Sequence, residues 1–188
     1  PPTKAGTAMN KLTVDVAVIG TGTAGLSAYR AARAQGRRTV LIESGPYGTT
    51  CARVGCMPSK LLIAASEAAH MLQVAAGFGV HAGEVRIDGK EVMDRVRCER
   101  DRFVGFVLEG VDNIPGQDKV TGHARFTGPH SLQVDGHTEI EVSRVVIATG
   151  SRPYVPVELR DVGPGVIVSD QVFDWTDLPE SVAVIGTG

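Results

Sequence analysis

The chain has 188 residues, of which 43% are hydrophobic and 21% are charged, and its formal net charge is -2. This composition is typical of a globular protein with room for one full core and part of another, and it gives no electrostatic reason to bind nucleic acid or anionic lipid. We find no apolar run approaching the roughly 20 residues that a membrane span requires and no secretory signal, so we expect a cytoplasmic protein without membrane attachment.

The first 43 residues carry the pattern of one βαβ unit. Residues 13–20 form a continuous Val-rich apolar run, as expected of a strand buried on both faces of a parallel sheet. A Gly-rich turn follows, and then the Ala-rich residues 24–35 favour a helix that Gly36 can end. Residues 39–43 read as the second strand.

The middle of the chain is predicted to be helical. A Gly- and Thr-rich stretch over residues 45–55 leads into a second helix that begins near Cys56. A third helix is predicted from Glu91, because apolar side chains recur on one face at a spacing of 3.6 residues, at Val92, Val96, Phe103 and Val107.

Short β-type stretches follow at residues 119–122, 125–127 and 131–134, separated by Gly-Pro and Asp-Gly turn signals. They predict a small antiparallel meander. Residues 144–150 read as a further buried strand that ends in glycine, and residues 151–180, with several Pro and Gly, as an irregular connection.

The chain contains an internal repeat. Residues 182–188 copy residues 16–22, Val-Ala-Val-Ile-Gly-Thr-Gly, which implies two nucleotide-binding βαβ units in the parent protein. The second unit stops within its phosphate turn, so we expect the chain to be a fragment that cannot bind a nicotinamide cofactor at Gly186 and Gly188. Residues 1–8 precede Met9 without hydrophobic periodicity, and we expect them to be a leftover of cloning.

The first glycine motif predicts a dinucleotide pyrophosphate site. Gly20 permits the tight turn, Gly22 leaves room for phosphates, and Gly25 lets the helix approach the strand. Glu43, at the end of the next strand, is placed to accept hydrogen bonds from an adenosine ribose. A Gly-rich turn inside another α/β domain is the alternative.

The second motif is a pair of cysteines, Cys51 and Cys56, five residues apart. In a regular helix they would be offset by about 7.5 Å along the axis and could not be bridged, so a disulfide needs an irregular turn, for which Gly55 supplies the freedom. Pro58 suits the first turn of a helix and places Cys56 beside its N-terminus, where the helix dipole stabilises a thiolate. The cysteine pair has three possible interpretations. It is a catalytic disulfide, part of a zinc site whose other ligands are missing, or two unrelated thiols that pack in the core.

These motifs resemble a known family. Gly48-Thr-Thr-Cys51 through Cys56-Met-Pro-Ser-Lys60 is similar to the active-site signature of the pyridine nucleotide-disulfide oxidoreductases, most closely of dihydrolipoamide dehydrogenases, over residues 14–188. The family usually has a second Gly at the position of Thr49 and Pro or a small residue at that of Thr23. A β-branched residue such as Thr49 resists a positive φ.

The resemblance implies an α/β fold. It consists of a Rossmann-like FAD-binding domain over residues 9–150, with an inserted helical segment that carries the redox cysteines and a small antiparallel β meander. Residues 151–180 would connect it to the truncated start of an NAD-binding domain at residues 181–188.

The resemblance also implies roles for single residues. Cys51 would exchange with a dithiol substrate, Cys56 would contact the flavin, and Lys60 would tune the isoalloxazine, although a solvated helix lysine is the simpler reading of Lys60 alone. The cofactor-binding residues that we expect are Gly20, Gly22, Thr23, Ala24, Gly25, Glu43, Ser44, Thr50, Cys51, Cys56, Lys60, His123, Ala124, Thr149, Gly150 and Ser151.

By the same resemblance the complete enzyme would be a homodimer that oxidises dihydrolipoamide, free or carried on a protein, with FAD and with NAD on the missing domain. Mercuric reductases share Pro-Ser-Lys after Cys56, whereas glutathione reductases usually have Lys in place of Ser59. The remaining alternative is that the isolated chain is a non-catalytic FAD-binding module. Cys98 is expected to be a bystander thiol, no metal site is expected, and the five histidines lack a carboxylate at triad-like spacing.

Overall fold

The computed structural model describes residues 9–186, so the expectations for residues 1–8 and for Gly188 lie outside the described residues. The described chain divides into two compact units. The first comprises residues 9–50 and 105–152, and the second comprises residues 51–104 and 153–186.

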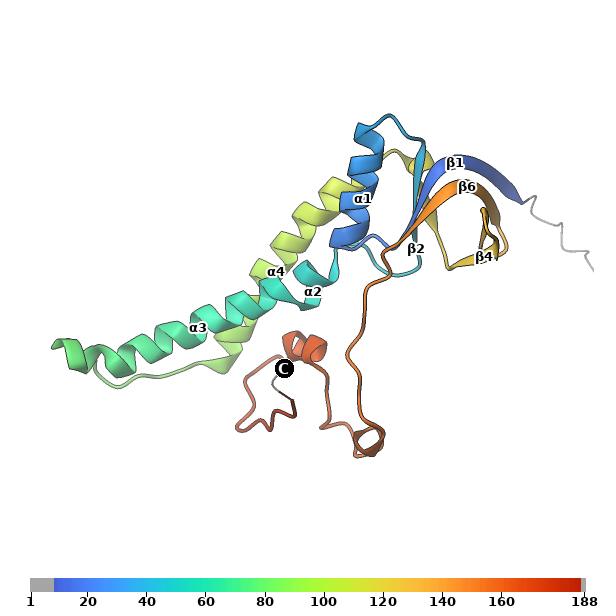
Figure 1. The fold of residues 1–188 in the computed structure, drawn as a ribbon. Helices are drawn as coiled ribbons and strands as arrows, with labels where there is room; N and C mark the ends of the chain where they lie inside the picture. The colour runs from blue at the N-terminus through green and yellow to red at the C-terminus, as the bar shows by residue number, and fades with distance from the viewer. Residues whose placement is uncertain (1–8, 187–188) are drawn as a thin grey trace, which may run out of the picture. The chain divides into compact units, whose positions relative to one another are not determined.

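The first unit is built on a six-stranded sheet in the order β3-β2-β1-β6-β5-β4 (Figure 1). Its parallel part consists of β1 (Asn10–Ile19), β2 (Thr39–Glu43), β3 (Lys119–Thr121) and β6 (Thr138–Ile147). Helix α1 (Thr23–Ala34) connects β1 to β2, and Gly36 follows it with a φ of 71°. The βαβ unit predicted from the sequence is therefore confirmed.

The second half of the sheet corrects two expectations. Only β4 (Ala124–Gly128), β5 (Ser131–Val134) and the first part of β6 form the antiparallel meander, because β3 instead pairs in parallel with β2. The strand predicted at residues 144–150 is the end of the longer β6, which pairs with β1 from Asn10 to Ile19.

The core of the first unit lies on both faces of the parallel strands. On one face, α1 and the last turns of α4 (Gly89–Asp112) bury apolar side chains against β1 and β2, the cluster being Val18, Leu26, Tyr29, Leu41, Val111 and Ile114. On the other face, the meander folds over β1 and β2, the cluster there including Ala17, Val40, Ile42, Leu132, Val134 and Ile140. The sheet is thus covered on two sides, as parallel strands require.

A buried polar contact ties α1 to the segment before β3. The Tyr29 hydroxyl donates a hydrogen bond of 2.6 Å to Asp118 Oδ2, in the short helix η2 (Gly116–Asp118). Burial and this hydrogen bond raise the pKa of Tyr29 to about 12. Arg33 Nε lies 3.6 Å from the same carboxylate oxygen, so the charge of Asp118 is compensated.

The second unit is mainly helical. It contains α3 (Cys56–Val74), the short helix η1 (Ala75–Phe78) and the first four turns of α4, and most of the short helix α2 (Thr50–Val54). In the part of α4 that belongs to this unit, Val96 of the predicted apolar stripe is fully buried together with its neighbour Met93, whereas Val92 and Phe103 are only partly buried. The connection forms only the short helices η3 (Val157–Leu159) and η4 (Ser169–Asp174).

The helical stretch Thr50–Phe78 corrects one sequence-based statement. It has 29 residues and contains an 18-residue window with a mean hydropathy of 1.3, so by length and composition it is long and apolar enough to cross a membrane. The sequence reading missed this stretch because Glu67 and several polar residues interrupt the apolar run. Core helices of water-soluble proteins have such compositions too, so this feature alone does not assign a membrane.

The second glycine motif does not form the expected strand. Residues 181–186 have no regular secondary structure, and Val182, Val184 and Ile185 are between 57% and 74% exposed. A strand requires a hydrogen-bonding partner, and none of the described strands pairs with this segment.

Candidate functional site

The four parallel strands of the first unit end at one edge of the sheet. Residues just after β1, β3 and β6 donate backbone hydrogen bonds to the ends of neighbouring strands. The Gly20 amide donates to Ile42 O at 2.8 Å, the Ala148 amide to Ile19 O at 2.8 Å, and the Gly122 amide to Glu43 O at 2.9 Å. Ligands of open α/β sheets bind at this carboxyl edge. The fold therefore brings the first glycine motif, Glu43, Gly122 and Ala148 to the edge where a dinucleotide is expected.

The three glycines of the first motif have different surroundings. A Cβ on Gly20, whose φ is 99°, would lie 2.8 Å from the carbonyl carbon of Ala148, and a Cβ on Gly25 would lie 2.9 Å from that of Gly20. A Cβ on Gly22, by contrast, would meet no atom within 4 Å. Gly20 and Gly25 are thus required by packing, whereas the space beside Gly22 is open to a ligand.

The N-terminus of α1 is free to bind an anion. Its N-cap residue is Gly22, which offers no side-chain cap, and no acidic side chain lies in the first turn. The first amide groups of a helix lack partners within the helix, and they carry a partial positive charge. Together with the open space at Gly22, this arrangement fits a pyrophosphate.

Glu43 braces the glycine turn. Its Oε2 accepts hydrogen bonds from the amide of Thr21, at 2.8 Å, and from the hydroxyl of Thr21, at 2.7 Å, while Oε1 accepts from the Gly45 amide at 2.8 Å. Burial raises the pKa of Glu43, but these hydrogen bonds and one from the Ser44 amide outweigh burial, so the pKa is lowered. A carboxylate has about four acceptor positions, so Glu43 can still accept from a ribose hydroxyl.

Thr21 is a site residue that the sequence reasoning missed. It is 2% exposed, and both its amide and its hydroxyl point to Glu43. No local signal in the sequence could have found it, because its partner lies 22 positions away. The remaining predicted residues of this unit at the strand ends, Thr23, Ala24, Ser44, Thr50, His123, Thr149, Gly150 and Ser151, are exposed.

Residues 122–124 are shaped by a contact with the following hairpin. The amide of His123 donates to Asp135 Oδ2 at 2.9 Å, and Gly122 has a φ of 139°. A Cβ on Gly122 would lie 2.7 Å from Val134 Cγ1. Asp135 therefore holds the backbone of His123 in place, beside the partly buried Ala124.

The two cysteines lie in the second unit as neighbouring free thiols. Cys51 is in α2, Cys56 is the first residue of α3, and Gly55 between the helices has a φ of −124° and a ψ of −117°. This single non-helical residue breaks the regular helix in which the thiols would be too far apart. The two thiols are close enough for the Cys56 side chain to shift the pKa of Cys51, although most of the expected irregular turn is in fact helical.

The backbone amides at the N-terminus of α3 influence the pKa of Cys51. The hydrogen bond with the Cys56 side chain and burial raise the pKa of the Cys51 thiol, while hydrogen bonds from the backbone amides of Cys56 and Met57 act in the opposite direction. Cys51 is half-buried and Cys56 is exposed. Two thiols that interact across a helix break, one of them exposed, are suited to thiol–disulfide exchange.

Other sulfur and nitrogen side chains contribute less. Lys60 is exposed on the first turns of α3, and Cys98 is exposed on α4, consistent with a bystander thiol. Within residues 9–186, no group of three or more His, Cys, Asp and Glu side chains is placed to hold a metal ion.

Thr49 adopts the conformation that its residue type resists. Its φ is 59°, next to Gly48 with a φ of 114°, immediately before α2. The left-handed region costs a residue with a Cβ roughly 1–2 kcal/mol. The backbone at Thr49 thus has the conformation expected for a glycine, and this conformation is strained because the residue is a threonine.

Comparisons with known proteins agree with this arrangement. Residues 14–188 match the pyridine nucleotide-disulphide oxidoreductase family. The chain is 33% identical to mycothione reductase of Mycobacterium tuberculosis (94% of this chain, 39% of the relative), 32% to glutathione reductase of Burkholderia cepacia (96% and 39%) and 35% to dihydrolipoyl dehydrogenase of Halobacterium salinarum (93% and 38%). The chain thus spans about two fifths of the length of these relatives.

A solved structure has a similar fold. The HOCl-induced flavoprotein disulfide reductase RclA of Escherichia coli superposes with a TM-score of 0.67 at 26% identity, over 88% of this chain and 35% of that protein. The family match covers the glycine motif, the cysteine pair and the strand ends described above. The chain therefore belongs to the pyridine nucleotide-disulphide oxidoreductases, a family of FAD-dependent enzymes.

Proposed function

We propose that this chain is the FAD-binding and redox-cysteine part of a disulfide oxidoreductase in which Cys51 and Cys56 alternate between dithiol and disulfide. The observation that carries the proposal is the contact between the two cysteine side chains across the helix break at Gly55. Disulfide exchange requires two thiols within bonding reach, of which at least one is accessible to substrate, and Cys56 is exposed while Cys51 is half-buried.

The substrate would be oxidised in two thiol–disulfide exchange steps. A substrate thiolate attacks Sγ of Cys51 in the disulfide, and Cys56 leaves as a thiolate. The second substrate thiol then displaces Cys51, so that the substrate leaves as a disulfide and the enzyme holds two thiols. Bound FAD would supply the two-electron acceptor chemistry that returns the cysteines to the disulfide.

The residues present fit FAD. Gly20, Gly22 and Gly25 with the first turn of α1 would hold the pyrophosphate, and Glu43 with Ser44 would meet the ribose. The open space at Gly22 and the uncapped helix end support this assignment. Further contacts proposed from the family resemblance come from Thr23, Ala24, Thr50, Cys51, Cys56, Lys60, His123, Ala124, Thr149, Gly150 and Ser151.

For the complete enzyme we propose dihydrolipoamide as the substrate and NAD, bound by the second glycine motif, as the electron acceptor. The enzyme would be a cytoplasmic homodimer. Dihydrolipoyl dehydrogenases among the relatives support this choice, but mycothione and glutathione reductases are equally similar. A mercuric reductase is a further candidate because of Pro-Ser-Lys after Cys56, and the isolated chain would act as an FAD-binding module.

The FAD assignment is tested with Gly22→Ala in this chain. Because the added methyl group meets no protein atom, the apoprotein should unfold at the same urea concentration as wild type, while FAD binds at least about tenfold more weakly, or about 1.4 kcal/mol. Gly116→Ala, which also meets open space, should change neither property. Unchanged FAD affinity in Gly22→Ala would refute the pyrophosphate site.

The redox assignment is tested in the complete enzyme with the wild type, Cys51→Ser and Cys56→Ser. We expect dithiol-dependent reduction of NAD by the wild type and its loss in both variants, with FAD content retained. Parallel assays with oxidised mycothiol, glutathione disulfide and Hg²⁺ identify the substrate. Wild-type turnover in either cysteine variant would exclude the cysteine relay.

A further inference from the structure

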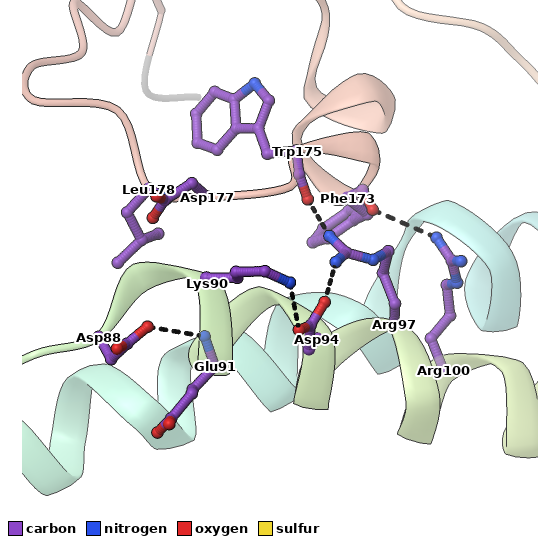
Figure 2. A network of polar contacts seen from close by, with 10 residues as sticks. All are labelled: Asp88, Lys90, Glu91, Asp94, Arg97, Arg100, Phe173, Trp175, Asp177 and Leu178. Carbon is purple, nitrogen blue, oxygen red and sulfur yellow. Dashed lines mark hydrogen bonds and ion pairs between the residues drawn. The ribbon is translucent and has the colours of Figure 1, made fainter.

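One face of α4 is in contact with the connection that leads to the second glycine motif (Figure 2). Gly89, Met93, Arg97 and Arg100 follow one another at intervals of three or four residues, and Val96 has the same spacing from Met93 and from Arg100, so all five lie on one stripe. Met93 and Val96 are fully buried, and the facing segment, Ser169–Leu178, contains the buried Phe173. All of these residues belong to the second unit.

Two arginines on this stripe bind the end of η4. Arg97 donates a hydrogen bond to the backbone carbonyl of Trp175, and Arg100 donates to that of Phe173 at 3.3 Å (Figure 2). The last carbonyl groups of a helix have no partner within it, and cationic side chains are favourable there. Both arginine side chains are mostly buried, with 24% and 17% of their surface exposed.

Arg97 is itself held in place. Asp94 accepts hydrogen bonds from Arg97 and from Lys90, the latter at 3.1 Å (Figure 2). An arginine that is fixed by a carboxylate on its own helix loses less side-chain entropy when it binds a carbonyl. Asp94 therefore holds the Arg97 side chain in the orientation in which it binds the Trp175 carbonyl.

Gly89 provides a second contact, at the start of α4. A Cβ on this residue would lie 2.8 Å from the backbone nitrogen of Leu178 and 3.0 Å from its Cβ, and closer still to the Asp177 carboxylate. The chain thus passes so near to the helix that only glycine fits. From Arg100 to Gly89 the segment follows α4 over eleven positions, about 16 Å along the helix axis.

We propose that this face of α4 anchors the connection, and that Arg97, Arg100 and Gly89 are positioning residues that fix the point from which the second glycine motif continues. The anchor ends at Leu178, three residues before Ser181. Without these contacts, residues 181–186 would continue from a connection that no helix holds in place. The part of this inference that concerns NAD rests on the proposed function, whereas the anchor itself does not.

The anchor is tested in this chain by hydrogen exchange of Gly89→Ala. Ala in place of Gly normally stabilises a helix by about 1 kcal/mol, so α4 should exchange no faster. The new methyl group should nevertheless displace Leu178, and amides in residues 173–178 should exchange at least about tenfold faster, which corresponds to about 1.4 kcal/mol. The matched control is Gly105→Ala, whose methyl group meets open space on the same helix. Wild-type exchange of residues 173–178 in Gly89→Ala would overturn the anchor.

A second variant removes the arginine contacts. Arg97→Gln with Arg100→Gln should release residues 169–178 to a similar degree, while Arg97→Lys with Arg100→Lys should restore part of the protection. Arg102→Gln, on the exposed side of α4, is the control. Equal protection in the Gln variant and the wild type would contradict the role of the arginines.

The positioning role is tested in the complete enzyme carrying the Gln pair. We expect a several-fold lower kcat with NAD, partly restored in the Lys pair, with unchanged FAD content and unchanged alkylation of Cys51. Loss of FAD together with activity, or an unchanged kcat, would overturn the positioning role. Failure of the proposed function would be visible separately, as a wild-type enzyme that does not reduce NAD.

Discussion

The carboxylate of Glu43 accepts hydrogen bonds from both the amide and the hydroxyl of Thr21, and this contact connects the end of β2 to the turn after β1. The turn is therefore braced by a side chain from the neighbouring strand rather than by its glycines alone. Because Thr21 is buried, the strength of this brace can be measured by a single substitution.

Thr21→Val should destabilise the chain by about 1–2 kcal/mol, because valine keeps the shape but removes the hydroxyl that donates to a charged acceptor. Urea unfolding at neutral pH measures the loss. Thr23→Val, an exposed position at the start of α1, should change stability much less. Equal stability of Thr21→Val and wild type would mean that the hydroxyl contributes nothing to the turn.

The brace should depend on pH. The lowered pKa of Glu43 means that its ionised form stabilises the fold above the unfolded value of about 4.3, and that this stabilisation is lost as pH falls through the folded value. The stability advantage of wild type over Glu43→Gln should thus be constant from neutral pH to about pH 5 and shrink below about pH 4. Urea titrations between these values measure it, with Glu139→Gln as the exposed control. An advantage that grows on acidification would contradict this sign.

Thr49→Gly should stabilise the chain. Glycine removes the roughly 1–2 kcal/mol cost of a left-handed threonine, and its greater freedom in the unfolded chain offsets about 0.5–1 kcal/mol of that gain. A net increase of about 0.5–1 kcal/mol is expected in urea unfolding. Thr50→Gly, the first residue of α2, should instead lower stability, and a destabilised Thr49→Gly would show that the threonine side chain outweighs its backbone strain.

Cys56→Ala should make Cys51 more reactive. The contact with the Cys56 side chain is the largest of the effects that raise the pKa of the Cys51 thiol, and the opposing backbone amides remain in the variant. Since the thiolate is the nucleophile, the rate of Cys51 alkylation by iodoacetamide near pH 8 should rise several-fold. The exposed Cys98 serves as the internal reference in the mass spectra. An unchanged or slower Cys51 would contradict the contact.

The first βαβ unit could be predicted from local sequence patterns. The Val-rich run before Gly20, the Ala-rich helix and the strand ending at Glu43 are encoded by side chains within a few positions of one another, so local preferences decide them. A disulfide between Cys51 and Cys56 would likewise need a break in the helix near Gly55, and the structure has a non-helical residue at Gly55.

The pairing of distant segments could not be predicted from the sequence and is known from the three-dimensional structure. β3 joins β2 in parallel, β6 continues along β1, Thr21 meets Glu43, and Arg97 meets Trp175 across 78 positions. The second glycine motif repeats the sequence of the first but forms no strand, because the first is paired on both sides and the second has no neighbour among the described strands. Hydrogen bonds between segments far apart in the chain depend on the overall fold. Local conformational preferences do not determine which distant segments come together.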